Sequence, residues 1–212
     1  MDKIHKPSKF GLPPKRGLYD PQFEKDSCGV GLVANIKGIP SREIMEDAFH
    51  INSRMDHRGG CGFEENTGDG AGILMAIPDN FFRLEAKKLN FNLPDQGNYA
   101  VGNIFLPQNK KERAYCIKVI EKTVIDQGLE LIGWRVVPTD HKKADVGPAA
   151  LDAQPFISQL FIGNNKGISQ EDFERQVYLI RKKFTHKLRS DASLKERSLM
   201  YACSLSSTVM TY

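Results

Sequence analysis

The chain has 212 residues, of which 40% are hydrophobic and 26% are charged. This length and balance are those of an ordinary globular protein with room for a sizeable core. The net charge of +4 is small, and no aromatic residues are interleaved with the basic ones, so nothing indicates a nucleic-acid partner. No apolar stretch approaches the ~18 residues of a membrane span, so we expect no membrane partner either.

The cysteine pattern argues against disulfides and against metal. The four cysteines lie at positions 28, 61, 116 and 203, with no CxxC pair and no tight cluster with histidine. We therefore expect no metal site and a reducing, cytoplasmic location. The basic N-terminus has no apolar region behind it, so it is not a secretory signal.

Residues 1–27 differ from the rest of the chain. They are polar, contain several prolines and show neither helical nor strand periodicity. They are either a flexible extension or a propeptide whose removal would expose Cys28. Cys28 itself is either a buried structural thiol or, after cleavage at Ser27–Cys28, an N-terminal nucleophile whose own α-amine accepts the thiol proton.

The next elements in chain order are a strand and a helix. Residues 30–36 form an apolar run that predicts a buried strand. Residues 41–55 predict a helix with Ser41 as its N-cap. Its apolar stripe predicts a core-facing helix and consists of Ile44, Met45, Ala48, Phe49, Ile51 and Met55.

A glycine-rich region follows, with six glycines among residues 59–72. Such backbone either adopts conformations that side chains forbid or is approached closely by another group. The region leads into an apolar run at residues 73–77 that predicts a strand, and phosphate-binding glycine loops lead into a helix. We therefore discount nucleotide binding.

The remaining chain alternates between helices and strands. We predict helices at 79–89, 110–127 and 169–188, the last capped by Ser169 with Asp172 in its first turn. We predict strands at 99–106, 129–137 and 155–162, and a loop at 139–153. Residues 198–212 alternate like a strand and stop in mid-pattern, which predicts that Tyr212 is a truncation point.

Five blocks of sequence, in order, resemble the glutamate synthase large subunit. The resemblance extends from about Leu18 to Tyr212 and includes the junction at which that family loses its propeptide. The blocks are Leu18–Gly31, His57–Gly62, Asn66–Leu74, Gly133–Pro138 and Phe173–Arg181.

This resemblance implies a class II glutamine amidotransferase domain at residues 28–212, with residues 1–27 as its propeptide. The implied fold is α+β: the N-terminal-nucleophile hydrolase αββα sandwich of four layers, incomplete at its C-terminus. The implied activity is hydrolysis of L-glutamine to glutamate and ammonia. The ammonia would pass to the remaining domains of the large subunit, which use FMN and an iron–sulfur cluster to aminate 2-oxoglutarate. The chain itself would hold no cofactor.

The resemblance also implies roles for individual residues. Cys28 becomes the nucleophile that forms a γ-glutamyl thioester, after processing between Ser27 and Cys28. Arg58 and Gly59, from the family's His-Arg-Gly motif, bind substrate or support the thiolate, since a fixed guanidinium favours the charged sulfur. A loop-tying role for Arg58 is the alternative.

Three residues near Arg58 and Gly59 could have catalytic or structural roles. His57 could be a base, but a histidine before a turn is more often structural. Cys61 is more simply a packed thiol, and Asp69 a turn residue. The family's oxyanion-hole and glutamine-binding motifs normally come after the position of Tyr212, so we expect little activity from these 212 residues alone.

Two other functions stay open. One is a non-catalytic binding or regulatory protein that retains the scaffold. The other is a papain-type cysteine hydrolase, which lacks an identifiable Asn or Asp partner here.

Overall fold

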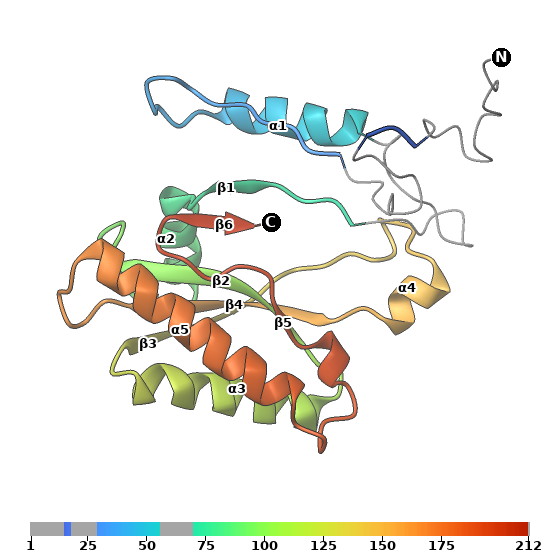
Figure 1. The fold of residues 1–212 in the computed structure, drawn as a ribbon. Helices are drawn as coiled ribbons and strands as arrows, with labels where there is room; N and C mark the ends of the chain where they lie inside the picture. The colour runs from blue at the N-terminus through green and yellow to red at the C-terminus, as the bar shows by residue number, and fades with distance from the viewer. Residues whose placement is uncertain (1–14, 18–28, 56–69, 212) are drawn as a thin grey trace, which may run out of the picture. The chain divides into compact units, whose positions relative to one another are not determined.

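A computed structural model describes residues 15–17, 29–55 and 70–211. The chain divides into two compact units, residues 1–60 and residues 61–212. Figure 1 colours the first unit in blue tones and the second from green to red. The described part of the first unit contains one helix, and the described part of the second contains all the strands.

The helix of the first unit, α1 (Arg42–Arg54), begins where the sequence predicts because Ser41 caps it. Ser41 has an extended backbone, and its Oγ accepts the amide of Ile44 at 3.3 Å. Phe49, predicted to face a core, is instead 67% exposed. It lies about 140° around the helix from Ile44, because each residue turns the helix by ~100°. The rest of the predicted stripe is half-buried: Ile44, Met45, Ala48, Ile51 and Met55.

The predicted buried strand at residues 30–36 is wrong. The structure has no strand there, and Val30 and Leu32 are 92% and 88% exposed. A strand requires a neighbour to satisfy its backbone donors and acceptors. No strand among the described residues pairs with this segment.

The larger sheet of the second unit has the strand order β3-β4-β2-β5, and all neighbours are antiparallel. The central strands β2 and β4 pair along their full length, from Tyr99 opposite Gly163 to Leu106 opposite Phe156. In both strands the side chains on each face of the sheet are largely buried, and this explains their almost continuous apolar sequences. The bounds are β2 (Tyr99–Leu106), β3 (Glu130–Val136), β4 (Phe156–Gly163) and β5 (Tyr201–Ala202).

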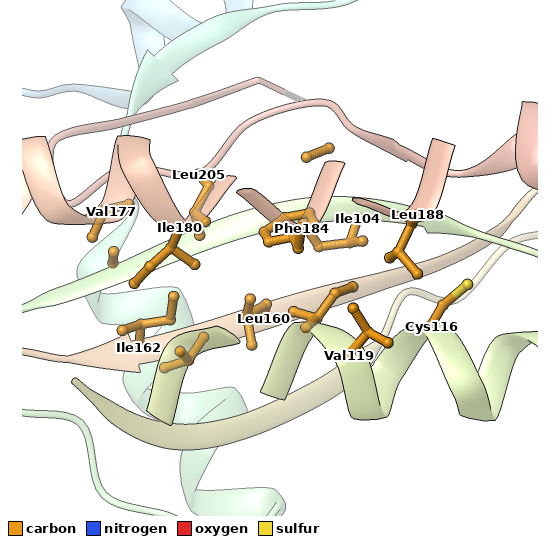
Figure 2. Close-up of a cluster of buried hydrophobic side chains, with 14 of the residues drawn as sticks. Ile104, Cys116, Val119, Leu160, Ile162, Val177, Ile180, Phe184, Leu188 and Leu205 are labelled. Carbon is orange, nitrogen blue, oxygen red and sulfur yellow. The ribbon is translucent and has the colours of Figure 1, made fainter. Parts of the chain in front are cut away.

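Two long helices, α3 (Lys110–Asp126) and α5 (Gln170–Arg189), cover one face of this sheet (Figure 1). Figure 2 shows Phe184 of α5 and Val119 of α3 directed toward Leu160 of β4. Even-numbered residues of β2 and β4 supply the sheet side of this core, as the two-residue period of a strand requires.

A bulge adapts the edge strand β3 to the same core. Its register against β4 shifts between Leu131 and Gly133. Leu131 and Trp134 therefore both pack on the core beneath α3 and α5, although they are three residues apart. Trp134 also donates its indole N–H to Glu121 of α3 at 3.1 Å.

The other face of the sheet carries a second sheet and a helix. Strands β1 (Leu74–Ala76) and β6 (Val209–Thr211) pair antiparallel. They enclose a separate core together with α2 (Asp79–Lys88). This core consists of Ile77, Phe82, Tyr99, Val101, Phe161 and Met210. Two antiparallel sheets thus lie face to face, with α3 and α5 on the outside of the larger one.

Two segments differ from the sequence prediction. The loop predicted at 139–153 contains a short helix, α4 (Pro148–Asp152), which starts with proline at a first-turn position and continues with good helix formers. The single strand predicted at 198–212 is two strands in different sheets, β5 and β6, after a 3₁₀ turn at Arg197–Leu199. The polar segment 203–208 crosses between them, and within it Oγ of Ser206 accepts the amides of Thr208 at 3.0 Å and Val209 at 3.3 Å.

The core beneath α5 predicts a contrast between two aromatic residues of that helix. Phe184 is fully buried, whereas Tyr178 is 54% exposed. We expect Phe184→Ala to lower the free energy of unfolding by about 3–5 kcal/mol, because it leaves a cavity. Tyr178→Ala should cost less than about 1 kcal/mol. Urea unfolding followed by circular dichroism measures both, and equal losses would contradict the core assignment.

An ion pair joins α2 to the larger sheet. Arg135 of β3 donates to Glu85 at 2.8 Å and to Gln159 at 2.9 Å. The side chains of Arg135 and Glu85 are only 12% and 16% exposed. Hydrogen bonds from Lys88, and then from Arg135, lower the pKa of Glu85. The ionised form of Glu85 therefore stabilises the fold above the unfolded pKa of ~4.3, and this contribution is lost as the pH falls toward the lowered value.

We expect Arg135→Gln to lower the urea midpoint clearly at pH 7, because Glu85 loses a largely buried partner. The deficit should shrink as the pH falls below the unfolded pKa of ~4.3, because the stabilisation by ionised Glu85 in the parent is lost between that value and its lowered pKa in the folded state. Lys122→Gln is the matched control, because the Lys122–Asp126 pair is 71% and 53% exposed and should contribute little. A deficit that stays constant down to pH 3 would contradict this account.

Candidate functional site

The residues predicted to carry the chemistry fall outside the described part of the chain. Ser27, Cys28, Arg58 and Gly59 all lie there, as do His57, Cys61 and Asp69. Their predicted roles stay predictions. The structure does describe the segments that adjoin two of these motifs: residues 29–55 after Cys28, and residues 70–76 after Asp69.

The segment after Cys28 turns back onto α1. Asn35 forms the turn, since its side-chain oxygen accepts the amides of Lys37 at 2.8 Å and Ile39 at 3.4 Å. Gly38 completes the turn with a φ of +67°, which favours glycine. The turn leads to the cap of α1, so residues 29–36 and α1 form one hairpin-like unit (Figure 1).

Gly31 lies against the last turns of α1. A Cβ built on Gly31 would fall well inside contact distance of Cγ2 of Ile51 and 2.8 Å from Cε of Met55. Glycine has no side chain, so it leaves the adjoining space open to another group. In the structure, side chains of α1 occupy that space.

The glycines at 70–72 lead into β1, as predicted. Phosphate-binding loops place their backbone amides at the N-terminus of a helix. Residues 70–72 lead into a strand instead.

The two described cysteines are not activated nucleophiles. Burial raises the pKa of the Cys116 thiol to about 11. Burial also raises the pKa of Cys203, although the nearby Arg181 opposes the shift. Reactive cysteines have a lowered pKa and are accessible. Neither of these thiols therefore competes with Cys28 for the role of nucleophile.

Sequence reasoning overlooked a polar group between the two sheets. Asn103 lies in the apolar strand β2, is 6% exposed, and donates to the carbonyl of Thr211 in β6 at 2.6 Å. Its Oδ1 has no partner, and neither do the buried hydroxyls of Ser204 and Ser207. An asparagine within an otherwise apolar strand is the sequence feature that could have predicted this buried polar group.

Helix α5 holds the crossing segment that carries these serines. Glu174 accepts the amide of Ser207, and Arg181 donates to the carbonyl of Ala202 at 2.8 Å. The ends of the segment 202–207 are therefore held by two charged side chains of α5, the helix that packs on the larger sheet.

No group suited to a metal ion occurs in residues 15–17, 29–55 or 70–211. Nowhere in these ranges do three or more His, Cys, Asp or Glu side chains gather closely enough to hold one.

Comparison with known proteins identifies the family. The family model described as "Glutamine amidotransferases class-II" matches residues 28–212. The chain belongs to the class-II glutamine amidotransferases. The amidotransferase match begins at Cys28, the residue that the sequence predicts as nucleophile. Membership in this family and the two facing antiparallel sheets confirm the predicted α+β, N-terminal-nucleophile fold class.

Similar proteins include several glutamate synthases. The chain is 39% identical over 202 residues to the "Glutamate synthase [NADPH] large chain" of Bacillus subtilis, covering 95% of this chain and 13% of the relative. It is 38% identical to the "Glutamate synthase [NADH]" of Saccharomyces cerevisiae, covering 99% of this chain and 10% of the relative. It is 38% identical to the "Ferredoxin-dependent glutamate synthase, chloroplastic" of Oryza sativa, covering 89% of this chain and 11% of the relative.

The amidotransferase chain therefore spans about a tenth of the length of these relatives. In the parts of it that the structure describes, every helix is too short or too polar to cross a membrane.

The environments of the two described cysteines predict slow alkylation in the native chain. At pH 8 we expect iodoacetamide to modify Cys116 at least ~100-fold more slowly in buffer than in 8 M urea, because the raised pKa alone lowers the thiolate fraction by that factor. Cys203 should also be slowed, though less. Peptide mass spectrometry measures both rates. A Cys116 rate that is equal with and without urea would show that this thiol is neither buried nor suppressed.

Proposed function

We propose that the chain is the glutamine-hydrolysing domain of a glutamate synthase large chain. The observation that carries the proposal is the amidotransferase match, which starts at Cys28 and continues to residue 212. The three relatives are all glutamate synthases, named for the electron donors NADPH, NADH and ferredoxin, and this supports the choice of parent enzyme. We further propose that the domain works in the cytoplasm.

The proposed reaction begins with removal of residues 1–27 as a propeptide. Hydrolysis of the Ser27–Cys28 bond converts the amide nitrogen of Cys28 into a free α-amine, which can accept the thiol proton. The thiolate then attacks the side-chain amide carbon of L-glutamine. The C–N bond breaks, ammonia leaves with the proton from the α-amine, and a γ-glutamyl thioester remains on Cys28.

Water completes the cycle by hydrolysing the thioester, which releases glutamate and returns the thiol. Arg58 is proposed to favour the thiolate by its positive charge, and Gly59 to leave room for substrate. The ammonia passes to the remaining domains of the large chain, which aminate 2-oxoglutarate with their own FMN and iron–sulfur cluster. The glutaminase step needs no cofactor in this chain.

The test uses the full-length gene product that carries this chain. We expect it to release ammonia from L-glutamine, and to lose residues 1–27 as judged by intact mass. Cys28→Ser should reduce ammonia release by at least about a thousandfold, as loss of a nucleophile does. Cys203→Ser is the matched control and should keep the parent rate, because the Cys203 thiol is not activated.

Each proposed element can fail separately. A processed protein with intact Cys28 that releases no ammonia would exclude the glutaminase function and favour a non-catalytic binding protein. A fully active chain that keeps residues 1–27 would exclude the propeptide. A Cys28→Ser protein with the parent rate would exclude the nucleophile assignment alone.

A further inference from the structure

We propose that helix α5 docks the domain onto an acidic surface of the remaining domains of the large chain. The contact is the outward face of the helix, which we call the α5 stripe. It consists of six exposed residues: Tyr178, Leu179, Lys182, Lys183, His186 and Lys187. The inference rests on the proposed function, because that function supplies the remaining domains.

The α5 stripe is one continuous face because its residues recur every four positions. Four residues turn an α-helix by ~400°, so Tyr178 lies beside Lys182, and Leu179 lies beside Lys183. The opposite face of α5 packs on the larger sheet through Phe173, Val177, Ile180, Phe184 and Leu188. The stripe therefore points away from the sheet that α5 covers (Figure 1).

The α5 stripe carries positive charge that nothing nearby balances. Near the start of the helix, Arg175 pairs with Asp172 at 2.9 Å, as charged residues one turn apart commonly do. After Glu174, α5 contains no acidic residue. In the part of the chain that the structure describes, three lysines of the stripe have no carboxylate partner: Lys182, Lys183 and Lys187.

The helix dipole accounts for only part of this charge. The carboxyl end of a helix favours cations within its last turn, and Lys187 lies there. Lys182 and Lys183 come before the last turn. Lys183 and Lys187 also lie one turn apart, where like charges repel each other. A surface of opposite charge stabilises all three lysines at once.

Two exposed apolar side chains adjoin the lysines. Tyr178 is 54% exposed and Leu179 is 48% exposed. The ammonium group of Lys182 lies 5.6 Å from the centre of the Tyr178 ring. Protein interfaces are enriched in tyrosine, with polar and charged residues at the rim. The phosphate backbone of a nucleic-acid duplex offers Tyr178 and Leu179 no apolar surface, so the combination favours an acidic protein surface as the partner.

The remaining domains of the large chain are the partner that the proposed function requires. The chain matches only 13%, 10% and 11% of the three glutamate synthases. Ammonia made in this domain reaches the remaining domains only if it does not escape into water, so the amidotransferase domain has to be held against them. The α5 stripe supplies both apolar contact and unbalanced charge for that docking.

The test measures lysine acetylation by acetic anhydride in the full-length gene product. Each rate is divided by the rate of the same lysine in concentrated urea, and peptide mass spectrometry provides both. We expect Lys182, Lys183 and Lys187 to react at least about tenfold more slowly in the native protein, because the docked surface excludes the reagent.

Lys87 is the control for this measurement. It is exposed in the last turn of α2, on the opposite face of the larger sheet, and should be slowed less than about threefold. If the three lysines of the α5 stripe are slowed no more than Lys87, the proposal is overturned.

Carbodiimide cross-linking, which joins lysine amines to carboxylates in direct contact, identifies the partner. We expect Lys183 or Lys187 to be joined to Asp or Glu residues of the remaining domains. Joining to a second copy, shown by mixing isotope-labelled and unlabelled protein, would overturn the proposal in favour of self-association. Protection that disappears after nuclease treatment would overturn it in favour of a nucleic-acid partner.

Charge reversal tests the electrostatic part of the contact. We expect Lys183→Glu combined with Lys187→Glu to raise the acetylation rate of Lys182 at least about fivefold, because repulsion loosens the docked surface. Lys87→Glu is the matched control and should leave that rate unchanged. An unchanged Lys182 rate in the reversed variant contradicts the proposal. If that variant does not fold, Lys183→Gln combined with Lys187→Gln takes its place and should raise the rate at least about threefold.

These measurements do not depend on turnover, so they separate this proposal from the proposed function. If the full-length protein releases no ammonia from glutamine while the α5 stripe is protected and cross-linked, the glutaminase function fails and the docking surface stands. If ammonia is released while the lysines of the stripe react as freely as Lys87, the docking surface fails alone.

Discussion

The antiparallel pairing of β2 with β4 is the interaction on which the rest of the second unit depends. The two strands pair residue by residue along their whole length and present alternate side chains to two faces. One face supports α3 and α5, and the other supports α2 and the sheet of β1 and β6. Tyr99 and Ala100, adjacent in sequence, belong to different cores for this reason. A shift of one residue in this register would exchange the two cores.

Polar and charged side chains join the layers where apolar packing alone would allow them to slide. Asn103 links the two sheets, and Arg135 links the larger sheet to α2. Tyr99 donates to Asp79 at the start of α2 at 2.9 Å, and burial together with this bond raises the pKa of Tyr99. A hydrogen bond has a defined geometry, whereas burial of apolar area does not. These links therefore select one arrangement among several that would bury similar area.

The proposed chemistry places opposite demands on the two sides of Cys28. On the N-terminal side the chain must be cut, because an amide nitrogen cannot accept a proton and an amine can. On the C-terminal side the backbone must be held, because a nucleophile acts only from a narrow range of positions.

The sequence by itself determined the type and order of most elements. Strong periodicity and good caps identified β2, α3 and α5 nearly to the residue, because those signals are local. It also determined the family and the chemistry expected of Cys28, since reactive groups are recognised by residue type and by flanking motif. The short helix α4 was missed because five residues carry too little periodicity to register.

Only the tertiary structure decided which segments pair and what fills the space at each glycine. Residues 30–36 have the composition of a strand, yet whether a strand forms depends on a partner elsewhere in the chain. The final segment was divided between two sheets by contacts with α5 and with β2, more than twenty residues away in the sequence. In the same way, only the fold shows that Ile51 lies beside Gly31. Contacts between residues distant in sequence leave no local pattern, so they are visible only once the chain has folded.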